Sequence, residues 1–317
     1  MTTPQPLSRL RTVGRISVGF LLDLVRLGRM DRDLLDALIL IAIVQANVAP
    51  VARDADLSRA YGDYDALPPD DMRRRVSVSA VAHSLRQPYE TVRRRVAALA
   101  AEGACAVTPA GVYVPGDTLH TPAHRQMVLE TYELIRTLYV RLRALDALPD
   151  LPRPELADGA VPADGAPVRA AVRLSSDYVL RIVDFMTQHV GDLITGLTLL
   201  TILRGNVEHF PDILNPEQEG GVESFAPDAL RRPMRISSVS ERLGVPEETV
   251  RRHATRLVAQ GYCVRTPEGF VTPAAVLARP RFIQLMGENH ANLRRMFEGL
   301  ARLGILAAWD GARPGGV

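Results

Sequence analysis

Clustered arginines are the residues in this sequence best suited to chemistry. Arg93, Arg94 and Arg95 are consecutive, and Arg251 and Arg252 stand in a similar segment further along. Every one of the 38 Lys+Arg positions is arginine, since the sequence contains no lysine. A planar guanidinium can bind a phosphate or a guanine edge through two parallel hydrogen bonds. The arginine clusters are therefore candidates for nucleic-acid binding.

Other site chemistries are not indicated by the residue spacing. The two cysteines, Cys105 and Cys263, are far apart and in no CxxC context, so they predict neither a disulfide framework nor a zinc site. Each should be a small buried side chain. The sequence has no P-loop, GxGxxG or GxSxG motif, and its histidines have no metal-ligand spacing. We expect no enzyme activity, no cofactor and no metal.

Composition is that of an ordinary folded protein. The chain has 317 residues, 47% hydrophobic and 23% charged, which is enough for two domains with their own cores. The net charge is only +2, so a nucleic-acid surface must come from local clustering. The N-terminus does not read as a secretory signal, and the apolar stretch 34–48 is too short for a bilayer span. We expect a buried helix there, no membrane association and a cytoplasmic, nucleoid-associated protein.

The chain contains an internal repeat. A shift of 158 positions places residues 78–115 on residues 236–273, and a shift of 159 places 33–48 on 192–207. The first shift continues through the closing segments, up to Leu145 and Leu303. Identities include Pro88/Pro246, Thr91/Thr249, Arg93/Arg251, Arg94/Arg252, Gly103/Gly261, Cys105/Cys263 and Gly111/Gly269.

The repeat predicts the domain boundaries. The first copy covers residues 1–145, the second covers 174–304, and a C-terminal tail covers 305–317. The Pro- and Gly-rich segment 146–173 reads as a flexible linker. Each copy has an insertion, 51–74 and 210–232, expected to be a loop whose end is held against the folded body.

Each copy should contain a helix, a turn, a second helix and a short hairpin. In the second copy, Ser237 or Ser238 would cap the first helix and Gly244 would end it. The next helix would begin at Pro246 and end at Gly261, with a buried stripe formed by Val250, Ala254 and Leu257. Thr-Pro-Glu-Gly then predicts a tight turn between two strands. Asn47 and Asn206 are expected to cap the C-termini of the helices that precede the insertions, with ligand contact as the alternative.

The segments at about 76–115 and 236–273 resemble the winged helix-turn-helix of bacterial transcription regulators. In that family the second helix enters the major groove of DNA. The resemblance implies DNA contact for the exposed side chains of that helix in both copies; a merely solvated helix face is the alternative. Those residues are Tyr89, Thr91, Arg93, Arg94, Arg95, Thr249, Arg251, Arg252, His253 and Arg256.

The order of elements resembles one subunit of the MarR-type regulators, which dimerise through terminal helices and bind small aromatic effectors. The closing segments have matching apolar stripes, Ile135, Leu138, Leu142 and Leu145 against Leu293, Met296, Leu300 and Leu303. These helices either pack on their own domains or pair with each other. The resemblance implies a mainly α protein with two winged-helix domains arranged as a pseudo-dimer, and a small-molecule effector as a further partner.

The sequence thus predicts a transcriptional regulator that reads an imperfect palindrome in double-stranded DNA, either as a monomeric pseudo-dimer or as a homodimer. Two alternatives remain open. A plasmid-type replication initiator would use tandem winged helices on repeated origin sites. A tandem winged-helix scaffold would bind protein partners without contacting DNA, and its arginines could be replaced without loss of function.

Overall fold

The structure is a computed structural model that describes residues 6–148, 151, 167–211 and 222–311. The described residues form thirteen α-helices and two antiparallel sheets of two strands each. The expectation of a mainly α protein is confirmed. Most of the expected linker (149–150 and 152–166), part of the second insertion (212–221) and the end of the tail (312–317) lie outside the described residues.

The chain divides into two compact units, and neither unit is one sequence copy. Unit 1 consists of Met1–Arg26, Val140–Ala147 and Phe185–Asn292. Unit 2 consists of Leu27–Tyr139, Leu148–Asp184 and Leu293–Val317. Each unit therefore combines the helix-turn-helix segment of one copy with the first helix of the other.

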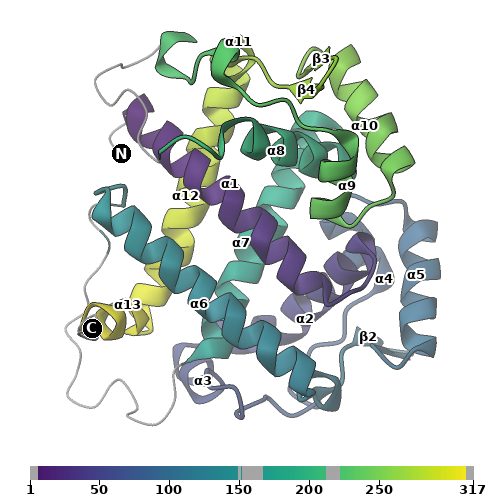
Figure 1. Cartoon of the computed structure of the whole chain (residues 1–317). Helices are drawn as coiled ribbons and strands as arrows, with labels where there is room; N and C mark the ends of the chain where they lie inside the picture. The colour runs from purple at the N-terminus through teal and green to yellow at the C-terminus, as the bar shows by residue number, and fades with distance from the viewer. Residues whose placement is uncertain (1–5, 149–150, 152–166, 212–221, 312–317) are drawn as a thin grey trace. The chain divides into compact units, whose positions relative to one another are not determined.

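Unit 2 is built around α2 (Leu34–Arg53), against which α4 (Val78–Ser84) and α5 (Tyr89–Ala101) pack (Figure 1). Strands β1 (Ala106–Thr108) and β2 (Gly111–Tyr113) form the hairpin that follows α5. The unit also contains α3 (Ala55–Ala60), the 3-10 helix η1 (Gly116–Leu119), α7 (Val168–Val190) as far as Asp184, α13 (Ile305–Gly311), and parts of the closing helices α6 (Pro122–Ala144) and α12 (Pro280–Arg302).

Unit 1 repeats this arrangement around α8 (Leu193–Val207), with α9 (Ile236–Leu243) and α10 (Glu247–Ala259) packed on it (Figure 1). Strands β3 (Val264–Thr266) and β4 (Gly269–Val271) form its hairpin. The remaining elements are α1 (Leu7–Arg29) as far as Arg26, α11 (Ala274–Leu277), the 3-10 helices η2 (Val222–Ser224) and η3 (Asp228–Leu230), and the parts of α6, α7 and α12 that lie outside unit 2.

The exchanged helices α1 and α7 hold their units through matching arginines. In unit 1, Arg11 donates to the carbonyl of Ser224, and Arg15 donates to that of Val207 at 2.9 Å. In unit 2, Arg169 donates to the carbonyl of Leu119 at 3.1 Å, and Arg173 donates to that of Tyr61 at 2.7 Å. The repeat therefore extends into the first helices at the same shift of 158, through Arg11/Arg169, Arg15/Arg173, Ser17/Ser175, Leu22/Leu180 and Val25/Val183.

Several sequence-based boundaries need correction. Helix α7 begins at Val168, so the last six residues assigned to the linker are helical. Helix α13 occupies much of the segment assigned to the C-terminal tail. The first insertion is not all loop, because α2 continues through Pro50 to Arg53 and α3 follows. Helices α7 and α13 contact residues far away in sequence, which local Pro and Gly content does not report.

The end of each insertion is fixed, as expected. Arg73 is buried and donates to the carbonyls of Pro68 and Val114, each at 3.2 Å, while it pairs with Asp70 at 3.1 Å. Arg231 has the same role in the second copy: it donates to Ala226 O at 3.1 Å and pairs with Asp228, also at 3.1 Å. Both arginines thus tie the insertion to its unit.

The closing helices α6 and α12 contact each other within unit 2. Their ring side chains Tyr139 and Phe297 lie 5.7 Å apart between centroids. Trp309 of α13 completes the cluster, with its indole N–H donating to the hydroxyl of Tyr132 at 2.8 Å. The apolar stripes expected on these helices are buried, except for the half-buried ends Leu145 and Leu303.

Among the described residues, α2 is the one single helix long and apolar enough to cross a membrane; α7 and α8 pass only as a pair, bent by 98°. Half of the apolar window of α2 is buried inside the protein, and the core helix of a soluble protein passes the same test. Neither α2 nor the bent pair of α7 and α8 is, by itself, evidence for a membrane span.

Candidate nucleic-acid interface

The two helix-turn-helix segments differ at the start and end of their first helix. In unit 2, Ser77 caps α4 by accepting a hydrogen bond from Ala80 N at 3.1 Å. In unit 1 the corresponding residue is Arg235, which makes no side-chain cap bond, and Ser237 and Ser238 lie inside α9. The expected serine cap in the second copy is therefore wrong.

The turn between the two helices requires a left-handed residue in both copies. Gly244 has φ 58° and ends α9, as expected. The corresponding residue of the first copy is Arg86, which adopts φ 50° despite its side chain. A non-glycine residue is strained in this conformation, so the first copy keeps the turn at a conformational cost.

The hairpin is tied to the preceding helix by a buried asparagine. The side-chain amide of Asn47 donates to Arg74 O at 2.7 Å and to Val112 O at 3.3 Å, and its Oδ1 accepts from Val114 N at 3.0 Å. Asn206 makes the same three bonds in unit 1, to Arg232, Phe270 and Thr272. The expectation that these two residues cap their helices is wrong, because their side chains position the hairpin instead.

Each hairpin has the expected turn. The glycine that ends the turn allows a neighbouring backbone segment to approach closely. Gly111 and Gly269 have φ of 128° and 153°. A Cβ at Gly111 would lie 2.6 Å from the carbonyl oxygen of Val76, the residue that bridges to Val112. Met234 and Phe270 form the matching bridge in unit 1. These bridges place a third strand-like segment beside each hairpin.

The second helix of each segment is oriented by its apolar face. Val92, Val96 and Leu99 of α5 are buried, and so are Val250, Ala254 and Leu257 of α10, as the sequence predicts. This burial turns the opposite faces of α5 and α10 toward solvent. Since side chains recur on one face every three to four residues, the burial decides which arginines point outward.

Arg93 and Arg94 of α5 are exposed, as are Arg251, Arg252 and Arg256 of α10. Arg93 and Arg251 each pair with a glutamate one turn earlier: Glu90 at 2.9 Å and Glu248 at 3.3 Å. Arg94 and Arg252 are also exposed, and within the described part of the chain neither has an ion-pair or hydrogen-bond partner. Exposed pairs of this kind contribute little stability, so the guanidinium groups that recur in both copies are available to an anionic partner.

The third arginine of the run is held by its own unit. Arg95 is half-buried and pairs with Asp33 at 2.7 Å and with Asp36 at 2.9 Å, both at the start of α2. This contact fixes α5 against α2. Arg95 therefore positions the helix that carries Arg93 and Arg94, and reaching a ligand would mean breaking two ion pairs.

In unit 1 the same anchoring uses a different set of groups. Asp192 caps α8 and pairs with Arg256 at 2.8 Å. Thr195 Oγ1 donates to Asp192 at 2.7 Å, which leaves His253 Nδ1 to donate to that hydroxyl, also at 2.7 Å. The pKa of His253 is lowered, and burial is the largest cause of this shift. His253 is therefore neutral at pH 7 and is hydrogen-bonded within its own unit. Arg256 pairs with Asp192 but remains half-exposed.

The remaining expected contact residues differ in exposure. Tyr89 has 48% of its surface exposed at the start of α5. Thr91 and Thr249 are half-buried. Two exposed arginines were not predicted as contact residues, namely Arg235 at the start of α9 and Arg265 of β3. The sequence does carry a signal for Arg265: it places a positive charge in the hairpin, at a position where the first copy has the apolar Val107.

The cysteines are buried, and burial raises the pKa of Cys263 to about 11 and that of Cys105 in the same direction. The described residues contain no group of three or more potential metal-binding side chains. Comparison of the chain with protein-family models, with curated proteins and with solved structures gives no match. The geometry of these two segments is therefore the basis for inferring a function.

Proposed function

We propose that the protein is a sequence-specific DNA-binding transcriptional regulator, with two winged-helix domains in one chain that act as a pseudo-dimer. The observation that carries this proposal is the recurrence of Arg93/Arg94 and Arg251/Arg252 on the outward face of corresponding helices. In both copies the inward face of the helix is buried against the preceding helix, so the outward face is the one that can meet a ligand.

The arrangement suits B-DNA for geometric and electrostatic reasons. A short helix that projects arginines can enter the major groove, where guanidinium groups bind guanine edges or neighbouring phosphates. The hairpin after each helix, with Arg265 in the second copy, can contact the adjacent backbone. The reciprocal exchange of α1 and α7 between the units supports the pseudo-dimer, since it joins the two copies as a swapped dimer joins two subunits.

The two copies should read related but unequal half-sites. They differ at Tyr89/Glu247, Arg95/His253 and Ala98/Arg256. We propose an imperfect palindrome whose half-sites are about 34–36 Å apart, as for dimeric helix-turn-helix regulators. Selection of bound sequences from a random pool, followed by footprinting, tests this; a perfectly symmetric site would contradict it. A DNA-binding regulator of this type would work in the cytoplasm, on the nucleoid.

The decisive experiment is fluorescence-anisotropy titration of the full chain with genomic fragments across a salt series. Arg93→Ala/Arg94→Ala and Arg251→Ala/Arg252→Ala should each weaken binding. For every arginine–phosphate interaction that a variant removes, the slope of log affinity against log salt should fall by about 1. Arg59→Ala/Arg181→Ala is the matched control, because it removes two exposed arginines from similar one-turn ion pairs elsewhere.

Each result has a clear meaning. Loss of sequence-dependent binding in both double variants, with the control unchanged, supports a regulator that uses both copies. Equal loss in the control would mean that only net charge matters. Binding that ignores sequence in every case, or no binding at all, overturns the proposal and favours the scaffold alternative.

A further inference from the structure

The two copies carry different charges on the surfaces proposed to meet DNA. Four exposed positions, at the start of the helix-turn-helix, at the start of its second helix and in the hairpin, are neutral in the first copy and charged in the second. They are Ser77/Arg235, Tyr89/Glu247, Val107/Arg265 and Ala110/Glu268. At these positions the second copy adds two cations and two anions, so it gains charge contrast without gaining net charge.

Three arginines between residues 75 and 115 have no arginine counterpart in the second copy, and all three are engaged within unit 2. Arg95 is held by the two aspartates at the start of α2, and Arg86 pairs with Asp184. Arg75 is half-buried, donates to backbone carbonyls, and its guanidinium lies 3.7 Å from the centre of the Tyr113 ring. These arginines therefore do not give the first copy a matching free charge.

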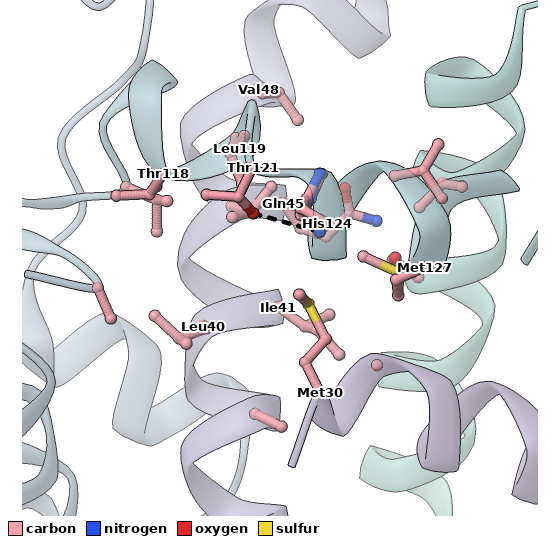
Figure 2. A pocket seen from close by; sticks show the side chains of 18 of the residues that line it. Met30, Leu40, Ile41, Gln45, Val48, Thr118, Leu119, Thr121, His124 and Met127 are labelled. Carbon is pink, nitrogen blue, oxygen red and sulfur yellow. Dashed lines mark hydrogen bonds between the residues drawn. The ribbon is translucent and has the colours of Figure 1, made fainter. Parts of the chain in front are cut away.

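The interior of unit 2 does not account for a difference at the start of α5. Unit 2 contains a cavity of about 370 Å³, with Ile41 and His124 among the side chains that line it (Figure 2). Glu102 and Gly103, which follow the C-terminal end of α5, form part of its wall, whereas no residue of α5 itself does. Helix α5 has 13 residues, so its first residue, Tyr89, lies about 20 Å from that end. The replacement of Tyr89 by a glutamate in the second copy is therefore a surface difference.

Glu247 is the exposed first residue of α10. Within the described part of the chain its carboxylate has no ion-pair or hydrogen-bond partner, although Arg251 lies one turn further along; Arg251 pairs with Glu248 instead. A second acidic residue is not needed to begin such a helix, since α5 has the same length and has Glu90 as the only acidic residue of its first turn. The carboxylate of Glu247 is thus free for a ligand.

A free carboxylate on a helix that faces DNA is a selective group. Phosphates and the acceptor atoms of bases repel it. In the major groove an amino group can satisfy it, and cytosine presents its N4 amino group without a neighbouring acceptor, whereas adenine presents N6 beside the acceptor N7. Cytosine is therefore the base that suits a glutamate best. Tyr89 carries no charge, so the first copy has no such requirement at the corresponding place.

We propose that Glu247 makes the second copy the discriminating half of the pair, by accepting a hydrogen bond from N4 of a cytosine in its half-site. The first copy, with Tyr89 there, tolerates other bases. The side chains of Arg235 and Arg265 are exposed and have no partners within the described ranges, so they can bind phosphates and offset the repulsion between Glu247 and the DNA backbone. This inference rests on the proposed function and names the base that makes its half-sites unequal.

The experiment compares the sequences bound by the full chain and by its variants. Sequences are selected from a random pool with the wild type and with Glu247→Tyr, which introduces the residue that the first copy has. In the wild type one half-site should contain a fixed cytosine, and replacing that base pair should weaken binding about tenfold in an anisotropy titration. Glu247→Tyr should remove this preference. Glu247→Gln should move it to adenine, because an amide can bind N6 and N7 together.

A reciprocal variant and a matched control complete the design. Tyr89→Glu should give the other half-site a fixed cytosine and so make the selected sequence more symmetric. Glu268→Ala is the control, because it removes an exposed carboxylate from the hairpin of the second copy and introduces the residue that the first copy has there. It should change the affinity for all sequences by the same factor. Circular dichroism and the unfolding midpoint check that each variant is folded.

The outcomes separate this inference from the proposed function. Sequence-dependent binding with the same base preferences in the wild type and in Glu247→Tyr would overturn the role of Glu247 and leave the regulator standing. So would a base preference that depends on Glu247 but is not for cytosine. Loss of the cytosine preference in Glu268→Ala as well would also overturn it, because net charge would then set the preference. Absence of any sequence-dependent binding would refute the regulator and this inference with it.

Discussion

The proposed recognition helices α5 and α10 are anchored at the same place by different chemistry. Asp33 and Asp192 occupy corresponding positions at the start of α2 and α8. Asp33, with Asp36, holds Arg95 through ion pairs, whereas Asp192 holds Arg256 directly and His253 through Thr195. A shared geometry with exchanged partners shows that the anchor is structural, and that the outward arginines common to both copies are the residues to test for function.

The two units differ more in their interiors. Arg169 and Arg173 line a pocket in unit 2 and are matched by Arg11 and Arg15 in unit 1, so the difference lies in His124: its Nδ1 has no hydrogen-bond partner, and the second copy has the buried Phe282 at that position. The duplicated chain has therefore kept its outward arginines in both copies while their cores diverged.

The largest effect should follow loss of either hairpin tie. Asn47→Ala and Asn206→Ala each remove three buried hydrogen bonds and leave backbone groups unsatisfied, so each should destabilise its unit by about 3 kcal/mol. Urea unfolding of both variants measures the loss. Nearly equal losses would show that the two ties are energetically equivalent; a loss below that of an ordinary surface substitution in either copy would contradict the structural role.

The next largest effect is a pH dependence that belongs to His124 in unit 2. Its folded pKa of about 4 lies below the unfolded value, so the unfolded chain binds more protons and stability falls as pH drops below about 6.5. Between pH 7 and pH 5 this single group should remove about 2 kcal/mol. Unfolding at both pH values, for the wild type and His124→Phe, checks the prediction. An unchanged pH slope in the variant would assign the effect elsewhere.

The elements of each copy could be predicted from sequence because their signals are local. The buried stripe of α10, the left-handed Gly244 and the Thr-Pro-Glu-Gly turn depend on residues a few positions apart, and the structure has all of them. The exchange of α1 and α7 could not be predicted this way. An amphipathic helix shows which face is buried, but it does not show which copy buries that face.

The candidate site was predictable only in part for a similar reason. Three consecutive helical residues point about 100° apart, so sequence alone indicates that two of Arg93–Arg95 face outward without identifying the third. Arg95 becomes the inward residue because Asp33 and Asp36 lie beside it, and those residues are about sixty positions earlier. The cavity depends on the packing of α7 on the first copy, so no local pattern reports it.

The turns between the paired helices provide a smaller and reciprocal test. Arg86→Gly should stabilise unit 2 by about 0.5–1 kcal/mol, because glycine adopts the left-handed conformation without strain. The ion pair of Arg86 with Asp184 is largely exposed, so its removal offsets little of this gain. Gly244→Ala should destabilise unit 1 by about 1–2 kcal/mol. Thermal unfolding that shows the same sign for both changes would exclude the backbone explanation.

The smallest effect separates the two anchors. Asparagine can still cap a helix, so Asp33→Asn and Asp192→Asn should keep α2 and α8 intact and remove only the ion pairs, at about 0.5–1 kcal/mol each. Their consequences for DNA should differ. Asp33→Asn leaves Asp36 to hold Arg95, whereas Asp192→Asn releases Arg256, so only the second should add a cation to the exposed face of its helix. We therefore expect tighter nonspecific DNA binding at low salt in Asp192→Asn alone, measured by anisotropy. The same gain in both variants would mean that Arg95 is as easily released as Arg256, and that the two anchors are equivalent in function as well as in place.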